Sequence, residues 1–146
     1  MIAVDTNLLV YAHREDSKWH AEAKRALTDL AESGAEWALP WPCVHEFLGI
    51  VTHPRIFWPP TPLDQALVAV DAWLGVPRVV ILGESLEYWQ ILRPLLVTSK
   101  VVGPKIHDAR IAALCRDHAV DTLWSADRDF GRFSGLVVVN PLIGSS

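Results

Sequence analysis

Four acidic residues stand where predicted strands end or where predicted helices begin. They are Asp5, Glu46, Asp108 and Asp127. Carboxylates gathered in one pocket repel each other and need a countercharge to stay ionised. A hard divalent cation such as Mg²⁺ supplies that charge, and its usual chemistry in proteins is phosphoryl transfer or phosphodiester hydrolysis. The four residues therefore indicate a candidate metal-dependent nuclease site.

The elements that must position these acids follow from hydrophobic patterning. Short apolar runs alternate with helical patterns, which predicts βαβ units and a parallel sheet, an α/β fold. The predicted strands are Ile2–Val4, Glu36–Leu39, Val79–Leu82, Thr122–Trp124 and Leu136–Val139. The predicted helices are Ser17–Glu32, Pro42–Val51, one that begins at Pro62 with Thr61 as N-cap and Asp64 at N3, Ser85–Ser99 and Lys105–His118. Because ligands bind outside the carboxyl ends of the strands in such sheets, all four acids can converge on one edge.

Each acid also has a purely structural interpretation. Asp5 could cap a short helix through Asn7–His13, because Asp is a favoured N-cap. Glu46 could lie on a solvated helix face, and Asp108 and Asp127 could stabilise a first helical turn or cap a turn. We favour the site because Asp5-Thr6-Asn7 places several polar groups directly after a buried strand.

The polar neighbours of the acids have supporting roles in this interpretation. Thr6 and Asn7 are expected to orient Asp5 or a metal-bound water rather than to ligate directly. Ser125 could hold such a water or cap its turn. The cations nearest the acids in sequence could contact RNA phosphates or could serve only solubility. They are Arg110, Arg128 and Arg132.

Length and composition limit the class of protein. The 146 residues predict one domain, residues 1–146, and the net charge of −4 argues against binding nucleic acid by bulk electrostatics alone. A hydrophobic fraction of 51% with seven Trp predicts exposed apolar patches that suit a protein partner or a dimer. Cys43 and Cys115 are expected to be buried free thiols of a reducing cytosol. No signal peptide or membrane span is expected, so the predicted location is the cytoplasm.

Other catalytic classes lack their motifs. His45-Glu46 has no second His at helical spacing, so HExxH zinc chemistry is absent, and His107 is expected to be structural. There is no nucleophile elbow, Cys–His pairing or phosphate-binding glycine loop. A haloacid-dehalogenase-like phosphatase would need a second Asp at position 7, which is Asn7. A phosphoreceiver domain would need paired acids after the first strand.

The four acids and their flanking residues resemble the signature of PIN-domain ribonucleases and, within them, the VapC toxins of bacterial toxin–antitoxin pairs. The matching segments are Asp5-Thr6-Asn7, Glu46, His107-Asp108-Ala109 and Trp124-Ser125-Ala126-Asp127-Arg128-Asp129-Phe130. The resemblance covers essentially the whole chain. It implies an α/β/α sandwich with about five parallel strands and endonucleolytic RNA cleavage dependent on Mg²⁺ or Mn²⁺. It also implies that the acidic quartet is catalytic and metal-binding, and that the protein is a homodimer inhibited by a VapB-type antitoxin.

Ser125 departs from many relatives, which have Thr, but the hydroxyl is kept. Two other functions stay open beside the toxin: a housekeeping RNA-processing nuclease and a catalytically silent PIN-like binding module. The RNA expected for a toxin of this kind is a structured one, such as tRNA or ribosomal RNA. Recognition of RNA loops uses stacking on aromatic and Arg side chains. The candidates for this role are Trp41, Phe57, Trp58 and Arg128.

Overall fold

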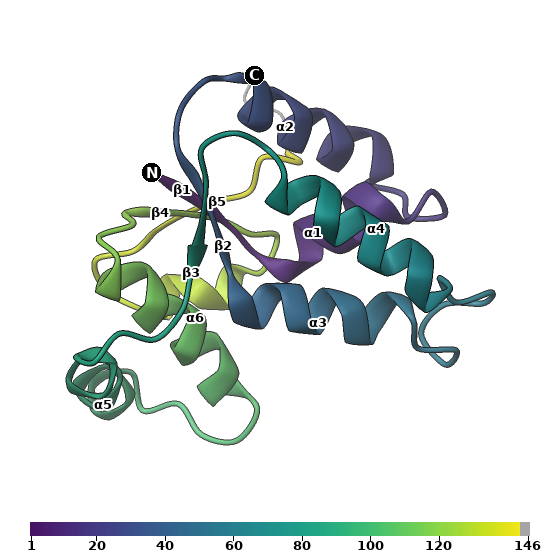
Figure 1. The fold of residues 1–146 in the computed structure, drawn as a ribbon. Coiled ribbons are helices and arrows are strands. Elements are labelled where there is room, and N and C mark those ends of the chain that lie inside the picture. The colour runs from purple at the N-terminus through teal and green to yellow at the C-terminus, as the bar shows by residue number, and fades with distance from the viewer. Residues whose placement is uncertain (144–146) are drawn as a thin grey trace.

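A single parallel sheet of five strands organises the protein. The computed structural model describes residues 1–143. The strands are β1 (Ile2–Val4), β2 (Trp37–Pro40), β3 (Val79–Leu82), β4 (Thr122–Trp124) and β5 (Val137–Val139). Their order across the sheet is β3-β2-β1-β4-β5, and every neighbouring pair is parallel (Figure 1). The central strands are apolar without alternation because both faces are covered.

Helices cover both faces of this sheet, as the predicted α/β/α sandwich requires. They are α1 (Thr6–His13), α2 (His20–Glu32), α3 (Trp41–Val51), α4 (Leu63–Leu74), α5 (Tyr88–Ser99), α6 (Lys105–Asp117) and the short 3₁₀ helix η1 (Arg128–Arg132). α1 to α4 pack together on one face, and α5 packs with α6 on the other (Figure 1). Right-handed crossovers explain this division, because the strand order advances in one direction from β1 to β3 and then reverses. The predicted fold class is confirmed.

The predicted cap of α4 is wrong. The helix begins at Leu63, with Pro62 at the N-cap position and no side-chain cap. Thr61 is buried, and its hydroxyl instead contacts the His13 ring at 3.1 Å and accepts a hydrogen bond from Arg14 at 3.2 Å. Thr61 therefore holds the loop before α4 against the end of α1.

Two other helices begin three residues later than predicted, and α3 and α6 differ from their predicted bounds by one residue. α2 begins at His20 rather than Ser17, because the Ser17 carbonyl closes a turn with the His20 N–H at 3.1 Å. α5 begins at Tyr88 and runs through Pro94 as one helix. The Pro-rich segment 53–60 is not helical.

The strand register places two chain segments side by side at the carboxyl edge of the sheet. Val4 of β1 lies opposite Trp124 of β4. The Asp5 N–H then donates to the Trp124 carbonyl at 2.9 Å, and the Ser125 N–H donates to the Val139 carbonyl at 3.0 Å. Asp5 and Ser125 thus leave adjacent strands at the same level. Across residues 1–143, none of the helices combines the length and apolar character that crossing a membrane requires.

Candidate active site

Asp5 is a buried carboxylate held by four donors. Its side chain is 4% exposed and caps α1, because Oδ1 accepts the Thr6 N–H at 2.8 Å. Oδ2 accepts the Ser125 hydroxyl at 2.7 Å and the Asn7 amide at 3.4 Å, and the Cys43 thiol lies 3.7 Å from Oδ1. The structural and the functional interpretations of Asp5 are therefore compatible, because the capping residue also faces the site.

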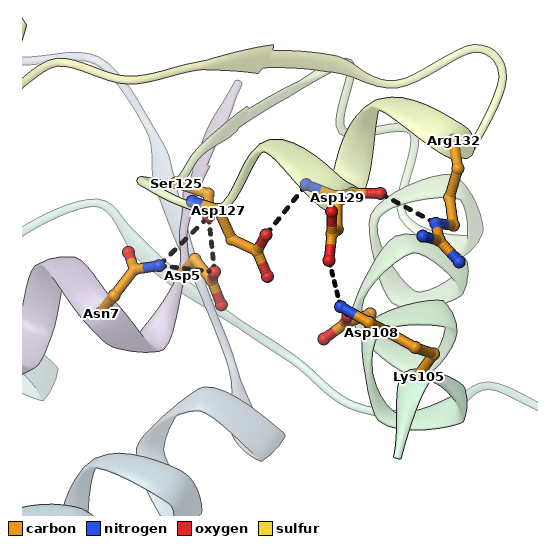
Figure 2. Close-up of polar contacts among 8 residues, drawn as sticks. All are labelled: Asp5, Asn7, Lys105, Asp108, Ser125, Asp127, Asp129 and Arg132. Atoms are coloured by element: carbon orange, nitrogen blue, oxygen red, sulfur yellow. Dashed lines mark hydrogen bonds and ion pairs between the residues drawn. The ribbon is translucent and has the colours of Figure 1, made fainter. Parts of the chain in front are cut away.

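Ser125 and Asn7 connect the two segments that leave β1 and β4. Besides donating to Asp5, the Ser125 hydroxyl accepts the Asn7 amide at 3.3 Å and the Asp127 N–H at 3.0 Å. Asn7 Oδ1 accepts the Ala126 N–H at 3.3 Å. Figure 2 shows this network around Asp5. Both side chains therefore fix backbone and carboxylate positions. For Ser125, capping of its turn and holding of a metal-bound water both stay open as roles, and the role of Asn7 beside a metal stays a prediction.

Glu46 joins the site through Thr6. The Thr6 hydroxyl donates to Glu46 Oε2 at 3.0 Å, so residues from α1 and α3 meet at the sheet edge. Thr6 is buried and Glu46 is exposed. The contact therefore fixes one oxygen of a side chain that otherwise faces solvent.

Asp127 and Asp108 approach from β4 and α6. Asp127 caps η1, with Oδ1 accepting the Asp129 N–H at 2.9 Å. Asp108, in the first turn of α6, lies 3.7 Å from the Lys105 ammonium, which also pairs with Asp129. Figure 2 shows Lys105 between these two carboxylates at the edge that Asp5 and Asp127 occupy. Lys105 thus partly neutralises this side of the cluster.

Charge repulsion and burial act on the same acids. Burial raises the pKa of Asp5 to about 6, and the nearby Glu46 charge adds to the effect despite the opposing hydrogen bonds from Ser125 and Thr6. Burial also raises the pKa of Asp108, and the charges of Asp127 and Glu46 raise it further. All four carboxylates therefore share one electrostatic environment with an excess of negative charge, and this is where a cation gains most.

The donor set fits a hard divalent cation. It consists of carboxylate oxygens, the ligands that Mg²⁺ and Mn²⁺ prefer. As the side chains lie, no three Asp, Glu, His or Cys residues within 1–143 surround a common point at coordinating distance. Coordination by several of the acids therefore requires side-chain rotation, which the exposed Glu46 and half-buried Asp108 and Asp127 allow. The role of these residues as ligands stays a prediction.

The predicted RNA-binding cations have different surroundings. Arg110 donates to Glu84 Oε1 from Nε at 3.2 Å and from Nη2 at 3.0 Å. Arg132 donates to the Asp129 carbonyl at 3.2 Å, and Arg128 is exposed at the start of η1.

The aromatic candidates do not lie together. Phe57 lies beneath the Arg14 guanidinium, 4.3 Å from its carbon to the ring centroid, in the segment 53–60. Trp58 is exposed in the same segment, beyond the C-terminal end of α3. Trp41 lies at the opposite end of that helix, nearer the acids, and its ring stacks on His45. Of the three aromatics, only Trp41 directly follows a strand, β2, at the carboxyl edge of the sheet.

Sequence reasoning missed Lys105 and Cys43. Lys105 stands three residues before Asp108 on one helix, a spacing that puts the two side chains on one face and could have indicated the pair. The contact of Cys43 with Asp5 had no local signal. Burial raises the pKa of the Cys43 thiol well above its usual value, with the Asp5 charge adding to it, and raises that of Cys115 to about 12. Both are buried free thiols, as predicted.

Comparison with known proteins agrees with this geometry. The family described as PIN domain matches residues 2–136. Ribonuclease VapC43 of Mycobacterium tuberculosis is 37% identical over 146 residues, covering 100% of this chain and 99% of the relative. Ribonuclease VapC48 of the same species is 33% identical over 141 residues, covering 96% and 97%.

Solved structures share the fold. A VapBC2 structure from Rickettsia felis, bound to a DNA fragment from its promoter, superposes with a TM-score of 0.67 at 23% identity, covering 96% of this chain and 98% of that one. VapC20 from Mycobacterium tuberculosis, described as a sarcin-ricin loop cleaving toxin, gives 0.64 at 18% identity, covering 90% and 93%. The fold and the sheet-edge acids thus define a PIN-domain protein. Together with the full-length relatives, they show that the chain belongs to the PIN-domain family and, within it, to the VapC ribonucleases.

Proposed function

We propose that this protein is an endoribonuclease and the toxin of a type II toxin–antitoxin pair, with residues 1–146 forming one PIN-like nuclease domain. The observation that carries the proposal is the acidic edge of the sheet. Asp5 is fixed there by Ser125 at 2.7 Å, and its neighbour Thr6 holds Glu46 at 3.0 Å. Relatives named as VapC ribonucleases, aligned over almost their whole length, support the same activity.

Asp5, Glu46, Asp108 and Asp127 would hold Mg²⁺, with Mn²⁺ able to replace it. When bound, the cation offsets the carboxylate charges, activates water for attack on phosphorus and stabilises charge on the phosphoryl oxygens. The protein then needs no covalent nucleophile.

The chain's own residues supply position and charge. Ser125, Asn7 and the Thr6 N–H keep the Asp5 carboxylate in one orientation, while the Thr6 hydroxyl orients Glu46. Fixed ligands of this kind reduce the reorganisation that the reaction requires. Arg128 and Arg132 on η1 would contact the phosphates of a bound RNA.

The proposed partners are a VapB-type antitoxin, a second copy of the chain and a structured RNA such as tRNA or ribosomal RNA. Structural neighbours described as VapBC complexes, and one described as cleaving the sarcin-ricin loop, support the first and the last. Exposed apolar side chains on and before α5 support a protein contact. They are Leu86, Trp89 and Val97. The two free thiols suit the reducing cytoplasm.

Incubation of purified, antitoxin-free protein with total bacterial RNA tests the proposal. Reactions contain Mg²⁺, Mn²⁺ or EDTA, beside an Asp5→Asn control. We expect discrete fragments with either metal, and none with EDTA or the variant. Intact RNA under every condition, from protein with a native circular dichroism spectrum, would favour a binding module without catalysis.

A further inference from the structure

A cavity of about 280 Å³ opens next to the acidic cluster, between the first turns of α3 and α6. Its lining combines an acid of the quartet with groups that can donate hydrogen bonds. The lining residues are Pro42, His45, Glu46, His107 and Arg110. Because Glu46 belongs both to the cavity wall and to the acidic cluster, a molecule in the cavity lies directly beside the proposed catalytic centre.

An aromatic stack borders the cavity, because His45, which lines it, stacks on Trp41 just outside the lining. Trp41 and His45 are four residues apart on α3, and their rings stack with centroids 6.1 Å apart and an interplanar angle of 18°. Trp41 remains 39% exposed. Gly83, the residue after β3, lies next to the indole of Trp41. A Cβ added at Gly83 would be in van der Waals contact with Trp41 Cδ1, at 3.5 Å. Trp41 is therefore an exposed aromatic surface whose position is set by its neighbours.

The other side of the cavity, on α6, provides hydrogen-bond donors. Arg110 is two residues beyond Asp108 and gives two N–H groups to Glu84. A guanidinium has five N–H donors, and those two are the only bonds Arg110 makes among residues 1–143. Glu84 thus fixes the orientation of the guanidinium, while further donors remain for an anion. The His107 ring adds a donor at the same wall.

We propose that this cavity and the exposed Trp41 ring bordering it together bind one unpaired nucleotide of the RNA, next to the scissile phosphate. Its base stacks on Trp41 beside His45, and its phosphate accepts hydrogen bonds from Arg110 and His107. An aromatic face combined with a planar guanidinium matches the two surfaces of a nucleotide, a π-face and an anion. The inference rests on the proposed function and adds to it that the substrate has an unpaired base flanking the cleaved bond.

Steady-state cleavage of a fluorescein-labelled RNA oligonucleotide, chosen from the fragments that the wild-type protein produces, tests this inference. Trp41→Ala cannot stack a base, so we expect its KM to rise by roughly tenfold or more and its kcat to fall by a smaller factor. Trp41→Phe retains an aromatic face and keeps KM within about threefold of wild type. Arg110→Gln loses the proposed phosphate contact, so we expect its KM to rise as well. Arg25→Gln, at an exposed position on α2, serves as the matched control and leaves KM unchanged.

An oligonucleotide with an abasic site next to the cleaved bond separates stacking from a structural role of Trp41. On that substrate the KM values of wild type and Trp41→Ala converge, because neither enzyme can stack a base. A Trp41→Ala defect of equal size on both substrates would overturn the inference, as would unchanged KM in both Trp41→Ala and Arg110→Gln. Weakened antitoxin binding with unchanged RNA kinetics would also overturn it and assign the cavity to protein contact. If the wild type cleaves no RNA, the proposed function itself fails.

Discussion

The Ser125 hydroxyl donates a 2.7 Å hydrogen bond to Asp5 Oδ2, across 120 positions of sequence. The bond joins the segments that follow two adjacent strands, β1 and β4. The orientation of a buried carboxylate thus depends on the correct register between β1 and β4.

Ser125→Ala removes that donor and leaves the Asp5 carboxylate under-bonded. We expect the free energy of unfolding in EDTA to fall by about 1–3 kcal/mol and cleavage to slow by about 10- to 100-fold. Urea denaturation and single-turnover cleavage measure the two effects. Ser125→Thr keeps the hydroxyl and should retain both properties. Equal losses in the Ala and Thr variants would show that the hydroxyl is not the cause.

Protonation of Asp5 should stabilise the metal-free protein as the pH falls toward 4. The pKa of Asp5 is raised from 3.8 to about 6 in the fold, so the folded state takes up a proton that the unfolded chain does not yet bind. Ionised Asp5 lowers the free energy of unfolding by its full amount above about pH 6. This loss of stability decreases as the pH falls and is gone near pH 3.8. It amounts to about 3 kcal/mol at most.

Denaturant unfolding in EDTA between pH 7 and pH 4 measures this dependence. Asp5→Asn has no titrating group at position 5 and should lose most of the slope. Asp108, whose pKa is also raised, adds to the slope, and His13, whose pKa is lowered by burial, opposes it. Identical slopes in the wild type and Asp5→Asn would contradict the pKa of Asp5.

The Thr6 hydroxyl orients Glu46 through its 3.0 Å bond. Thr6→Val keeps the shape of this buried side chain but removes the donor, so Glu46 gains freedom. We expect cleavage to slow by about tenfold with little change in the far-ultraviolet circular dichroism spectrum. Thr6→Ser should cleave at nearly the wild-type rate. If the Val variant is as active as the wild type, Glu46 does not depend on this contact.

Lys105 lies 3.7 Å from Asp108 and pairs with Asp129. Its ammonium repels a cation bound at Asp108, so Lys105→Gln should bind metal more tightly. Because the Lys105–Asp108 pair is partly exposed, its interaction free energy is small. We therefore expect the Mg²⁺ concentration at half-maximal cleavage to fall by about two- to fivefold, which corresponds to the free energy of one surface ion pair. A higher Mg²⁺ requirement would indicate instead that Lys105 helps to form the cation site.

Periodicity and turn signals were sufficient to predict the sheet and most helices. β1, β3 and β4 have the predicted bounds because short apolar runs between polar segments leave few alternatives. The Thr61 cap failed because a local capping pattern cannot show that Arg14 and His13 compete for the same hydroxyl.

The acidic residues could be predicted, but their mutual contacts could not. Asp5 and Asp127 follow strands, so the carboxyl-edge rule places them together. The bond between Thr6 and Glu46 depends on how α1 packs on α3, and the Trp41–His45 surface depends on the position of the chain after β3. These contacts arise from tertiary packing and leave no pattern at short range.

Binding of Mn²⁺ in the absence of RNA tests the central claim most directly, namely that the four carboxylates form one cation site. Electron paramagnetic resonance reports the free Mn²⁺ during titration with protein. Wild-type protein should bind the ion, and Asp5→Asn and Asp127→Asn should each bind it at least about tenfold more weakly. Asp29→Asn, at an exposed acid on α2, should bind like the wild type. Equal Mn²⁺ affinity in all four folded proteins would contradict the assignment of the acidic edge as a metal site.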